Sequence, residues 1–247
     1  MKITSLRAVL VAPFALASFA TLPAADLFDG KTLAGWEGDL KWWRVQDGAL
    51  TGGSMTEKVP RNFFLATTKS YQNFELTLKL KLTGVPGTGM INSGVQVRSV
   101  RVPQHTEMAG YQVDAGDGWW GKLYDESRRR KVIAVPADEA AVNAAVKKDD
   151  WNEYRIRAEG PRLRAWINGV PTFDYTETDP TVALDGHIAV QIHSGGMAVV
   201  QAKEVRIDEL PPTPGAPTWA KVGMPKAPDP AAKKKKAAPP ADAKKAP

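Results

Sequence analysis

Strict alternation of apolar and polar residues is clearest in one segment of the chain. Residues 74–82, FELTLKLKL, place an apolar side chain at every second position, the period of a strand with one buried face. Further short segments have a strand-like composition: 151–158, 162–167, 170–175, 187–193 and 199–207. The dipeptides Asp47-Gly48 and Asn168-Gly169 are typical of two-residue type I′ hairpin turns. The pattern predicts an all-β domain, a sandwich or jelly roll, in which only residues 138–147 resemble a helix.

Two further segments would place polar side chains on one face of a sheet. In residues 92–98 and 110–114 the polar positions are Asn92, Gln96, Arg98, Gln112 and Asp114, and they alternate with Ser93, Val95, Val97, Tyr111 and Val113. Because strand side chains alternate between faces, the second set packs into a core and the first set lies together. This content predicts a binding or catalytic surface. Sugars are its natural ligand, because amides both donate and accept hydrogen bonds.

Two more segments contribute candidates for the same polar face. His187, Gln191 and His193 share one side of a predicted strand. Imidazole titrates near neutral pH, so His193 is our first candidate for a general base or acid. A structural histidine that bonds a neighbouring loop is the competing interpretation, and the favoured one for His187. If residues 122–126 are extended, Lys122, Tyr124 and Glu126 share a face, although the run 125–131, DESRRRK, equally suits a solvated loop.

The beginning of the chain has the pattern of a secretory signal peptide. Lys2 and Arg7 precede an apolar run over residues 8–20, and small residues follow up to residue 25. The run is shorter than the ~20 apolar residues that span a membrane, and an uncleaved anchor is the alternative. We therefore expect removal of residues 1–25 and export to the periplasm or the extracellular space. The folded domain is expected to cover residues 26–210.

The end of the chain, residues 211–247, has a different composition. It is rich in proline, alanine and lysine and contains eight lysines but two aspartates. Such a segment cannot bury enough apolar surface to fold, so it predicts a disordered basic tail. The tail either increases solubility or binds anionic envelope polymers or lipid headgroups. Because it carries most of the chain's excess charge of +6, the domain is nearly neutral and we expect no nucleic-acid partner.

Several other chemistries find little support in the sequence. The chain contains no cysteine, which excludes disulfides, thiolate metal sites and a cysteine nucleophile. The glycines at 84, 87 and 89 follow a strand but precede no predicted helix, so a phosphate-binding loop is not expected. Neither a diagnostic metal-ligand spacing nor a serine triad emerges. We expect no cofactor, and a divalent metal such as calcium is left open for a sandwich of this shape.

A series of short motifs is similar, in order, to one known family. Residues 27–36, LFDGKTLAGW, resemble the opening of the 3-keto-disaccharide hydrolase domain family. Further segments that match its motifs are 43–50, 73–76, 92–98, 110–114, 151–154, 166–169, 187–195 and 205–207. Each motif alone is weak, but together they extend over nearly all of residues 26–210.

The resemblance implies a concanavalin A-like, laminin-G-like jelly-roll sandwich of two antiparallel sheets. It also implies glycosides whose C3 hydroxyl has been oxidised to a ketone. The ketone acidifies the hydrogen on C2, and its removal permits expulsion of the group on C1, with or without later addition of water. At one position the chain departs from the family. Many members carry glutamate directly after Tyr111, where this chain has Gln112, and the acid follows at Asp114.

These considerations assign expected roles to ten residues. His193 would be base or acid, Asp114 a base or an orienting group, and Arg98 would polarise the ketone. A salt bridge between Asp114 and Arg98 is the alternative for that pair. The residues expected to bind the sugar are Asn92, Gln96, Gln112, Lys122, Tyr124, Glu126 and Gln191. A non-catalytic, lectin-like carbohydrate-binding module is the main rival function, and an envelope scaffold anchored by the tail is a third.

Overall fold

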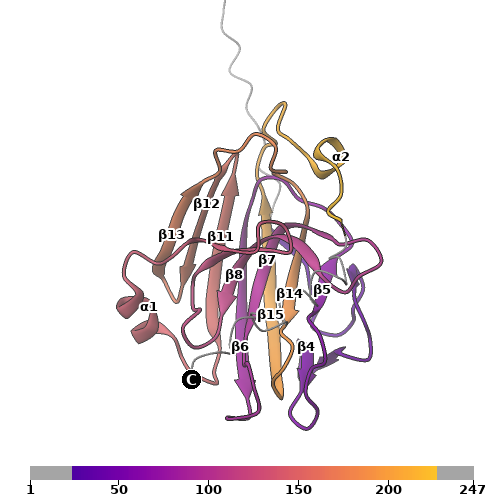
Figure 1. The fold of residues 1–247 in the computed structure, drawn as a ribbon, viewed down its shortest axis with the longest axis vertical. Helices are drawn as coiled ribbons and strands as arrows, with labels where there is room; N and C mark the ends of the chain where they lie inside the picture. Colours follow the sequence, from indigo (N-terminus) through magenta and orange to yellow (C-terminus); the bar gives the residue numbers. More distant parts are fainter. Residues whose placement is uncertain (1–23, 227–247) are drawn as a thin grey trace, which may run out of the picture.

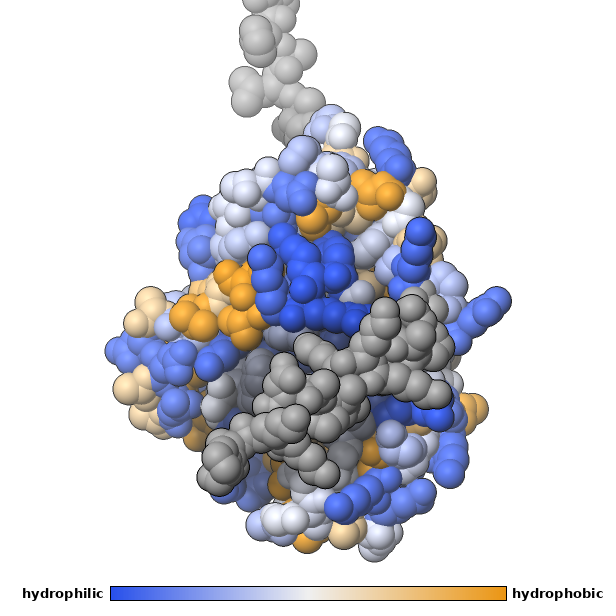
Figure 2. Space-filling model, viewed as in Figure 1, coloured by the Kyte–Doolittle hydropathy of each residue, from blue (hydrophilic) through white to orange (hydrophobic). Residues whose placement is uncertain are grey.

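The computed structural model of the chain describes residues 24–226 as a sandwich of two antiparallel β-sheets (Figure 1). This arrangement confirms the predicted all-β sandwich. The predicted signal peptide lies almost wholly outside the described residues. The surface seen in Figure 2 is mostly hydrophilic, with hydrophobic residues in separate patches. No helix within the described part of the chain is both long and apolar enough to span a membrane.

The two sheets differ in the strands that they contain. Sheet A has the spatial order β13 (Val170–Thr176), β12 (Arg162–Ile167), β11 (Asn152–Glu159), β6 (Phe74–Gly84), β15 (Ala198–Glu209), β4 (Ala49–Ser54) and β3 (Trp43–Gln46), and β1 (Ala25–Asp26) also pairs with β15. Sheet B has the order β10 (Val132–Ala134), β9 (Leu123–Glu126), β8 (Met108–Ala115), β7 (Ser93–Arg101), β14 (His187–Ile192), β5 (Phe63–Thr67) and β2 (Trp36–Glu37). The helices are α1 (Glu139–Ala145) and α2 (Trp219–Val222).

Strand β6 shows how the alternating sequence produces the core. Its apolar residues Leu76, Leu78 and Leu80 are buried between the sheets, whereas Lys79 and Lys81 lie on the outer face of sheet A. The strand pairs with β11 on one side and β15 on the other. Burying a leucine side chain contributes about 1.5–3 kcal/mol, so β6 is a central source of stability.

The predicted turns and the predicted helix are present. Asn168 and Gly169 have φ of 49° and 81°, the positive pair that a type I′ turn requires, and they connect β12 to β13. Asp47 and Gly48 have φ of 52° and 69° and connect β3 to β4 in the same way. Helix α1 begins after Asp138, whose carboxylate accepts a hydrogen bond from a first-turn N–H at 2.8 Å.

Arg98 does not lie on the polar face that alternation predicted for it. The register of β7 against β8 shifts between Val97 and Val100, and Arg98 has φ of 51°, which indicates a β-bulge that redirects the side chain. The fully buried guanidinium donates to the backbone oxygens of Gln72 at 2.8 Å and Gly160 at 2.7 Å. A third bond reaches Asn73 Oδ1 at 3.0 Å. Arg98 therefore connects β7 of sheet B to the segments that flank β6 and β11 of sheet A, and it does not lie on the polar face predicted for it.

The first part of the predicted disordered tail is ordered. Residues 211–226 fold back onto the sandwich and include α2. Within this segment Trp219 is only 8% exposed, and its backbone N–H donates to Asp185 Oδ1 at 2.8 Å. The composition of the segment does not predict this order, because one large aromatic side chain, Trp219, supplies the apolar surface that the flanking proline-rich sequence lacks. Residues 227–247, including the tetralysine run, lie outside the described residues.

Arg98 is expected to contribute strongly to stability. The substitution Arg98→Met would remove three hydrogen bonds and leave the buried backbone oxygen of Gly160 without its guanidinium donor, although Asn73 Oδ1 keeps the N–H of Gly160. We expect the free energy of unfolding to fall by about 3 kcal/mol or more, measured by urea unfolding of the purified variant.

Arg162→Met is the control for this measurement. Arg162 pairs with Asp174 at the surface, where about half of each side chain is exposed. Such pairs contribute roughly 0–1 kcal/mol. A similar loss of stability in both variants would contradict the structural role assigned to Arg98.

Candidate functional site

A cavity of about 300 Å³ opens on the outer face of sheet B. Its lining residues are Asn62, Met90, Asn92, Gln112, Asp114, Trp119, Tyr124, Glu126 and His193. Strand β8 supplies Gln112 and Asp114, and β9 supplies Tyr124 and Glu126. His193 directly follows β14. Adjacent strands thus bring together residues that are far apart in the chain, as the alternation of side chains predicted for them.

Gly94 leaves room for the side chain of Gln112. It lies in β7 opposite Asp114, and a Cβ atom built at Gly94 would lie 2.5 Å from Cγ of Gln112. Real Cβ atoms essentially never approach a neighbour so closely. A glycine at this position therefore allows the amide of Gln112 to lie across β7 and to reach partners on two strands.

Three glutamines form a buried hydrogen-bond network beside the cavity. Gln96 Nε2 donates to Gln112 Oε1 at 3.0 Å. Gln112 Nε2 in turn donates to Asp114 Oδ1 at 2.7 Å and to Gln191 Oε1 at 3.2 Å. Gln96 and Gln191 are fully buried and do not line the cavity. The sequence placed them on the correct face, but the structure gives them a supporting position rather than contact with the open space.

Asp114 has one carboxylate oxygen that is paired and one that is not. Gln112 occupies Oδ1, while Oδ2 is buried and has no hydrogen-bond partner among the described residues. Burial raises the pKa of Asp114 to about 8, and the hydrogen bond from Gln112 only partly opposes this rise. At neutral pH the group is therefore mainly protonated, and the proton belongs on Oδ2. Asp114 is one of the lining residues, so an unused hydrogen-bond donor lies buried in the wall of the cavity.

Glu126 is a second buried carboxyl group of the cavity. Burial, followed by the charge of Glu107, raises the pKa of Glu126 to about 7. Its Oε2 accepts a hydrogen bond from Gln191 at 3.3 Å, and Oε1 accepts from the backbone N–H of Ser127 at 3.1 Å. No arginine or lysine is among the residues that line this cavity. Both carboxyl groups consequently titrate near neutral pH instead of remaining ionised.

His193 contributes an imidazole whose tautomer is fixed by the backbone. Its Nδ1 lies 2.8 Å from the carbonyl oxygen of Ser194. That oxygen can only accept, so Nδ1 carries the hydrogen and Nε2 carries the lone pair in the neutral ring. The neighbouring loop is held by Asn62, whose Oδ1 accepts from the Ser194 N–H at 2.9 Å. His193 therefore offers Nε2 as a proton acceptor in the same cavity as the two carboxyl groups.

Two other candidates lie outside the cavity lining. His187 Nδ1 is 2.7 Å from the carbonyl oxygen of Thr67 on β5, which agrees with the structural role favoured for it. Lys122 precedes β9, and its Nζ lies 3.6 Å from Glu139 of α1 and 6.0 Å from the ring centre of Trp119. The structure therefore directs Lys122 towards α1 rather than placing it among the lining residues.

Sequence reasoning missed three residues of the cavity wall: Asn62, Met90 and Trp119. Trp119 packs edge-on against Tyr124, with ring centres 6.2 Å apart and an interplanar angle of 82°. The sequence did place Trp119 just after Gly116 and next to a predicted polar strand, and this position could have indicated that it lies near the site. All three lie in connecting segments, where side-chain direction does not follow from a simple period.

No group of three or more histidine, aspartate or glutamate side chains in residues 24–226 is arranged to hold a metal ion. The hydrogen-bonding groups of the cavity are instead amides, carboxyls, a phenol and an imidazole. Such groups bind uncharged hydroxyls and carbonyls and transfer protons to or from them.

Comparison with solved structures supports the fold. A proposed glycosyl hydrolase from Parabacteroides distasonis superposes with a TM-score of 0.56 at 21% identity, covering 76% of this chain and 100% of that one. A protein with a galectin-like fold from Bacillus subtilis has a TM-score of 0.56 at 11% identity, covering 79% and 98% of the respective chains. The carbohydrate recognition domain of Emp47p gives 0.52 at 11% identity, with 79% and 99% covered.

The family assignment rests on the sequence itself. A comparison with curated proteins finds no match. The sequence model of the 3-keto-alpha-glucoside-1,2-lyase-like domain, in contrast, matches residues 23–208. This match confirms the resemblance inferred from the ordered motifs and supports a carbohydrate-related role. The chain belongs to the 3-keto-alpha-glucoside-1,2-lyase-like domain family.

Proposed function

We propose that the protein cleaves the glycosidic bond of 3-keto-glycosides by elimination across C1 and C2. The observation that carries this proposal is the buried, unpartnered Oδ2 of Asp114, a residue that lines the same cavity as His193. A buried carboxyl group that titrates near neutral pH is characteristic of proton-transfer sites. Family membership supplies the substrate class, and the cavity supplies an acceptor and donors for its protons.

The first step is removal of the proton from C2. His193 Nε2 takes this proton, because its Nδ1–H is already committed to the Ser194 carbonyl oxygen. The electron pair of the C2–H bond forms the enolate of the C3 ketone. Collapse of the enolate forms a C1–C2 double bond and breaks the bond between C1 and the leaving oxygen. The products are an unsaturated 3-keto sugar and the released alcohol, to which a proton must be supplied.

The two carboxyl groups serve the oxygens on which negative charge develops. Protonated Asp114 and Glu126 can donate to the C3 oxygen and to the leaving oxygen, which stabilises both without a cation. Ordinary glycosidases use one ionised and one protonated carboxyl group. Here burial disfavours ionisation of both groups, which suits elimination better than displacement at C1.

The cavity lining also favours an uncharged substrate. It contains neither lysine nor arginine, so it offers no permanently cationic partner for a carboxylate, sulfate or phosphate group. Trp119 supplies an apolar wall suited to the carbon face of a sugar ring. We therefore expect neutral 3-keto-glucosides to be preferred over 3-keto-uronides.

The reaction class is tested by offering purified protein a nitrophenyl glucoside and its 3-keto derivative. We expect nitrophenol release from the keto compound alone. In deuterated water, elimination followed by hydration places deuterium on C2, whereas direct hydrolysis does not. Release from neither compound, together with measurable sugar binding, would favour the lectin-like module.

The substitution Asp114→Asn tests the role of the protonated carboxyl group. It retains the size of the side chain and an acceptor for Gln112 but cannot transfer a proton. We expect kcat to fall by roughly 10²–10⁴-fold while sugar binding is retained. Asp117→Asn is the matched control, because Asp117 is exposed on the following loop and does not line the cavity. Unchanged kcat in Asp114→Asn would exclude Asp114 as the proton donor.

Activity is expected to depend on pH through both carboxyl groups. Because the protonated forms of Asp114 and Glu126 are both required and their pKa values are about 8 and about 7, kcat should fall as pH rises through this range. A pH–rate profile measures this alkaline limb. In a variant that retains residual activity without Asp114, the limb should become less steep.

Replacing Asp114 should lower activity but raise the stability of the fold at alkaline pH. The pKa of this group is higher in the folded state than its ordinary value of 3.8, so the folded state binds more protons. Wild-type stability is therefore expected to fall as pH rises from about 4 to about 8. Asp114→Asn should reduce this slope, so that the variant gains Tm over the wild type at pH 8.5 but not at pH 4. Equal slopes would contradict the raised pKa.

A further inference from the structure

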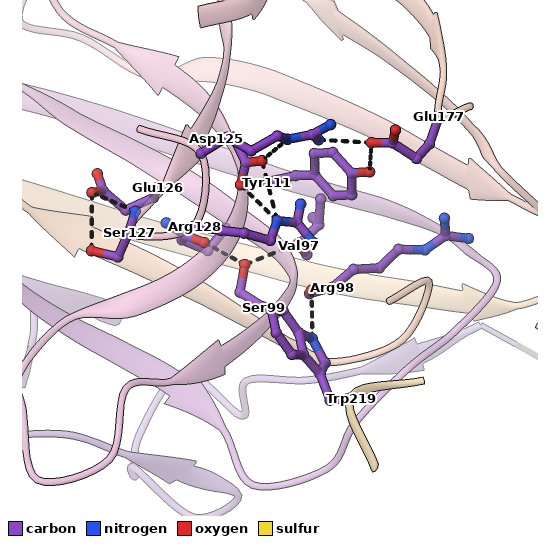
Figure 3. Close-up of polar contacts among 12 residues, drawn as sticks. Val97, Arg98, Ser99, Tyr111, Asp125, Glu126, Ser127, Arg128, Glu177 and Trp219 are labelled. Atoms are coloured by element: carbon purple, nitrogen blue, oxygen red, sulfur yellow. Dashed lines mark hydrogen bonds and ion pairs between the residues drawn. The ribbon is translucent and has the colours of Figure 1, made fainter. Parts of the chain in front are cut away.

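A buried ion-pair cluster lies on the opposite side of β9 from the cavity. Asp125 is fully buried, and its Oδ1 accepts from Arg128 Nε at 2.9 Å. Arg129 Nε also bonds this carboxylate, and Arg129 Nη2 donates to Glu177 Oε2 at 2.7 Å. Figure 3 shows these contacts, with Glu126 directed away from them. Neighbouring residues of one short strand therefore face the cluster and the cavity.

The cluster fixes the β9–β10 hairpin. Asp125 accepts, through its backbone oxygen, a hydrogen bond from the Arg130 N–H at 2.8 Å, and its own N–H donates to Lys131 at 2.9 Å. Arg128 and Arg129 belong to this same turn. Their bonds to the Asp125 side chain therefore hold the turn in addition to the backbone hydrogen bonds. Any displacement of the turn would move β9, which carries Tyr124 and Glu126 into the cavity.

The guanidinium group of Arg128 contacts two aromatic rings. Its Cζ lies 4.5 Å from the ring centre of Tyr111 and 5.6 Å from that of Trp219. Its Nη1 and Nη2 are buried, and no hydrogen-bond acceptor among the described residues reaches them. The two ring faces are therefore the main compensation for burying this part of the guanidinium. Tyr111 belongs to β8 of the sandwich, but Trp219 does not belong to either sheet.

Trp219 comes from a segment beyond the family domain. The family match ends at residue 208, whereas Trp219 lies in α2. Its indole Nε1–H donates to the backbone oxygen of Arg98 at 3.1 Å, and its backbone N–H donates to Asp185. The residue is thus anchored to the bulge of β7 and to the loop before β14, with its ring placed against Arg128 (Figure 3).

We propose that Trp219 is a positioning residue, which clamps Arg128 and thereby fixes the β9–β10 hairpin with Glu126 directed into the cavity. The inference rests on the proposed function in so far as Glu126 acts on the substrate. The residue touches neither the cavity nor the substrate, so its effect passes through Arg128 and Asp125. A segment outside the matched family domain thus secures one wall of the site.

The test uses the full chain with Trp219→Ala and Trp219→Phe. Hydrogen exchange of the hairpin amides, those of Asp125 and Arg130 in particular, reports the clamp without requiring turnover. We expect exchange in Trp219→Ala to be roughly tenfold faster, the order expected for loss of a desolvated cation–π contact. Trp219→Phe keeps a ring face over Arg128 and should restore most of the protection.

Turnover of a 3-keto-glucoside supplies the second measurement. A misplaced Glu126 weakens interactions made in the transition state, so Trp219→Ala should lower kcat by roughly tenfold with little change in KM. Trp219→Phe should again be close to the wild type. If Trp219→Ala folds poorly, Arg128→Lys tests the same contact from the hairpin side and should accelerate exchange of the same amides.

Trp166→Ala is the matched control. Trp166 also stacks on an arginine, with Arg155 Cζ at 3.8 Å from its ring centre, but it lies on β12 of the other sheet. This variant should leave hairpin exchange and kcat unchanged. Wild-type hairpin protection in Trp219→Ala, or no rescue by phenylalanine, would overturn the clamp. Accelerated exchange in a protein that does not cleave 3-keto-glycosides would support the clamp and refute the proposed function.

Discussion

The site depends on the burial of a carboxyl group that no cation neutralises. Asp114 lies on β8 with apolar strands behind it and three glutamines beside it. One of these amides, that of Gln112, donates to Oδ1 of Asp114, while Oδ2 is buried without a partner among the described residues. An ionised carboxylate in this place would be poorly solvated, so the fold favours the protonated acid. The burial of this carboxyl group depends on the two sheets, on Gly94 and on the amide network.

Strand β9 carries two buried carboxyl groups, and their surroundings differ. Asp125 and Glu126 are consecutive, yet their carboxyl groups face different environments. Asp125 receives two guanidinium groups, those of Arg128 and Arg129. Glu126 receives an amide and a backbone N–H, and its pKa rises to about 7. A period of two residues is thus sufficient to separate a structural anion from a group that can exchange protons.

Periodicity in the sequence was enough to predict the strands and the face that carries the site. Asn92, Gln112, Asp114, Tyr124, Glu126 and His193 line the cavity because each lies on or next to a strand whose alternation is regular. Periodicity did not predict the position of Arg98, because a single β-bulge changes the alternation of its strand. The local composition gives no sign of this bulge. Trp219 was missed for another reason. Its burial depends on long-range contacts with β7 and with Arg128 in the β9–β10 turn, which the flanking proline-rich sequence does not reveal.

The sandwich itself does not separate a sugar-binding protein from a sugar-cleaving one, because solved relatives with this fold include a carbohydrate recognition domain. Amides and an aromatic wall suffice for recognition, and both are present here. A site built only for recognition has no need for a buried acid without a partner, since such a group lowers stability as pH rises. The buried Asp114 Oδ2, which has no hydrogen-bond partner among the described residues, is therefore the feature that supports the proposed proton transfer over binding alone. The protonation of a few carboxyl groups, rather than the architecture, distinguishes the two functions.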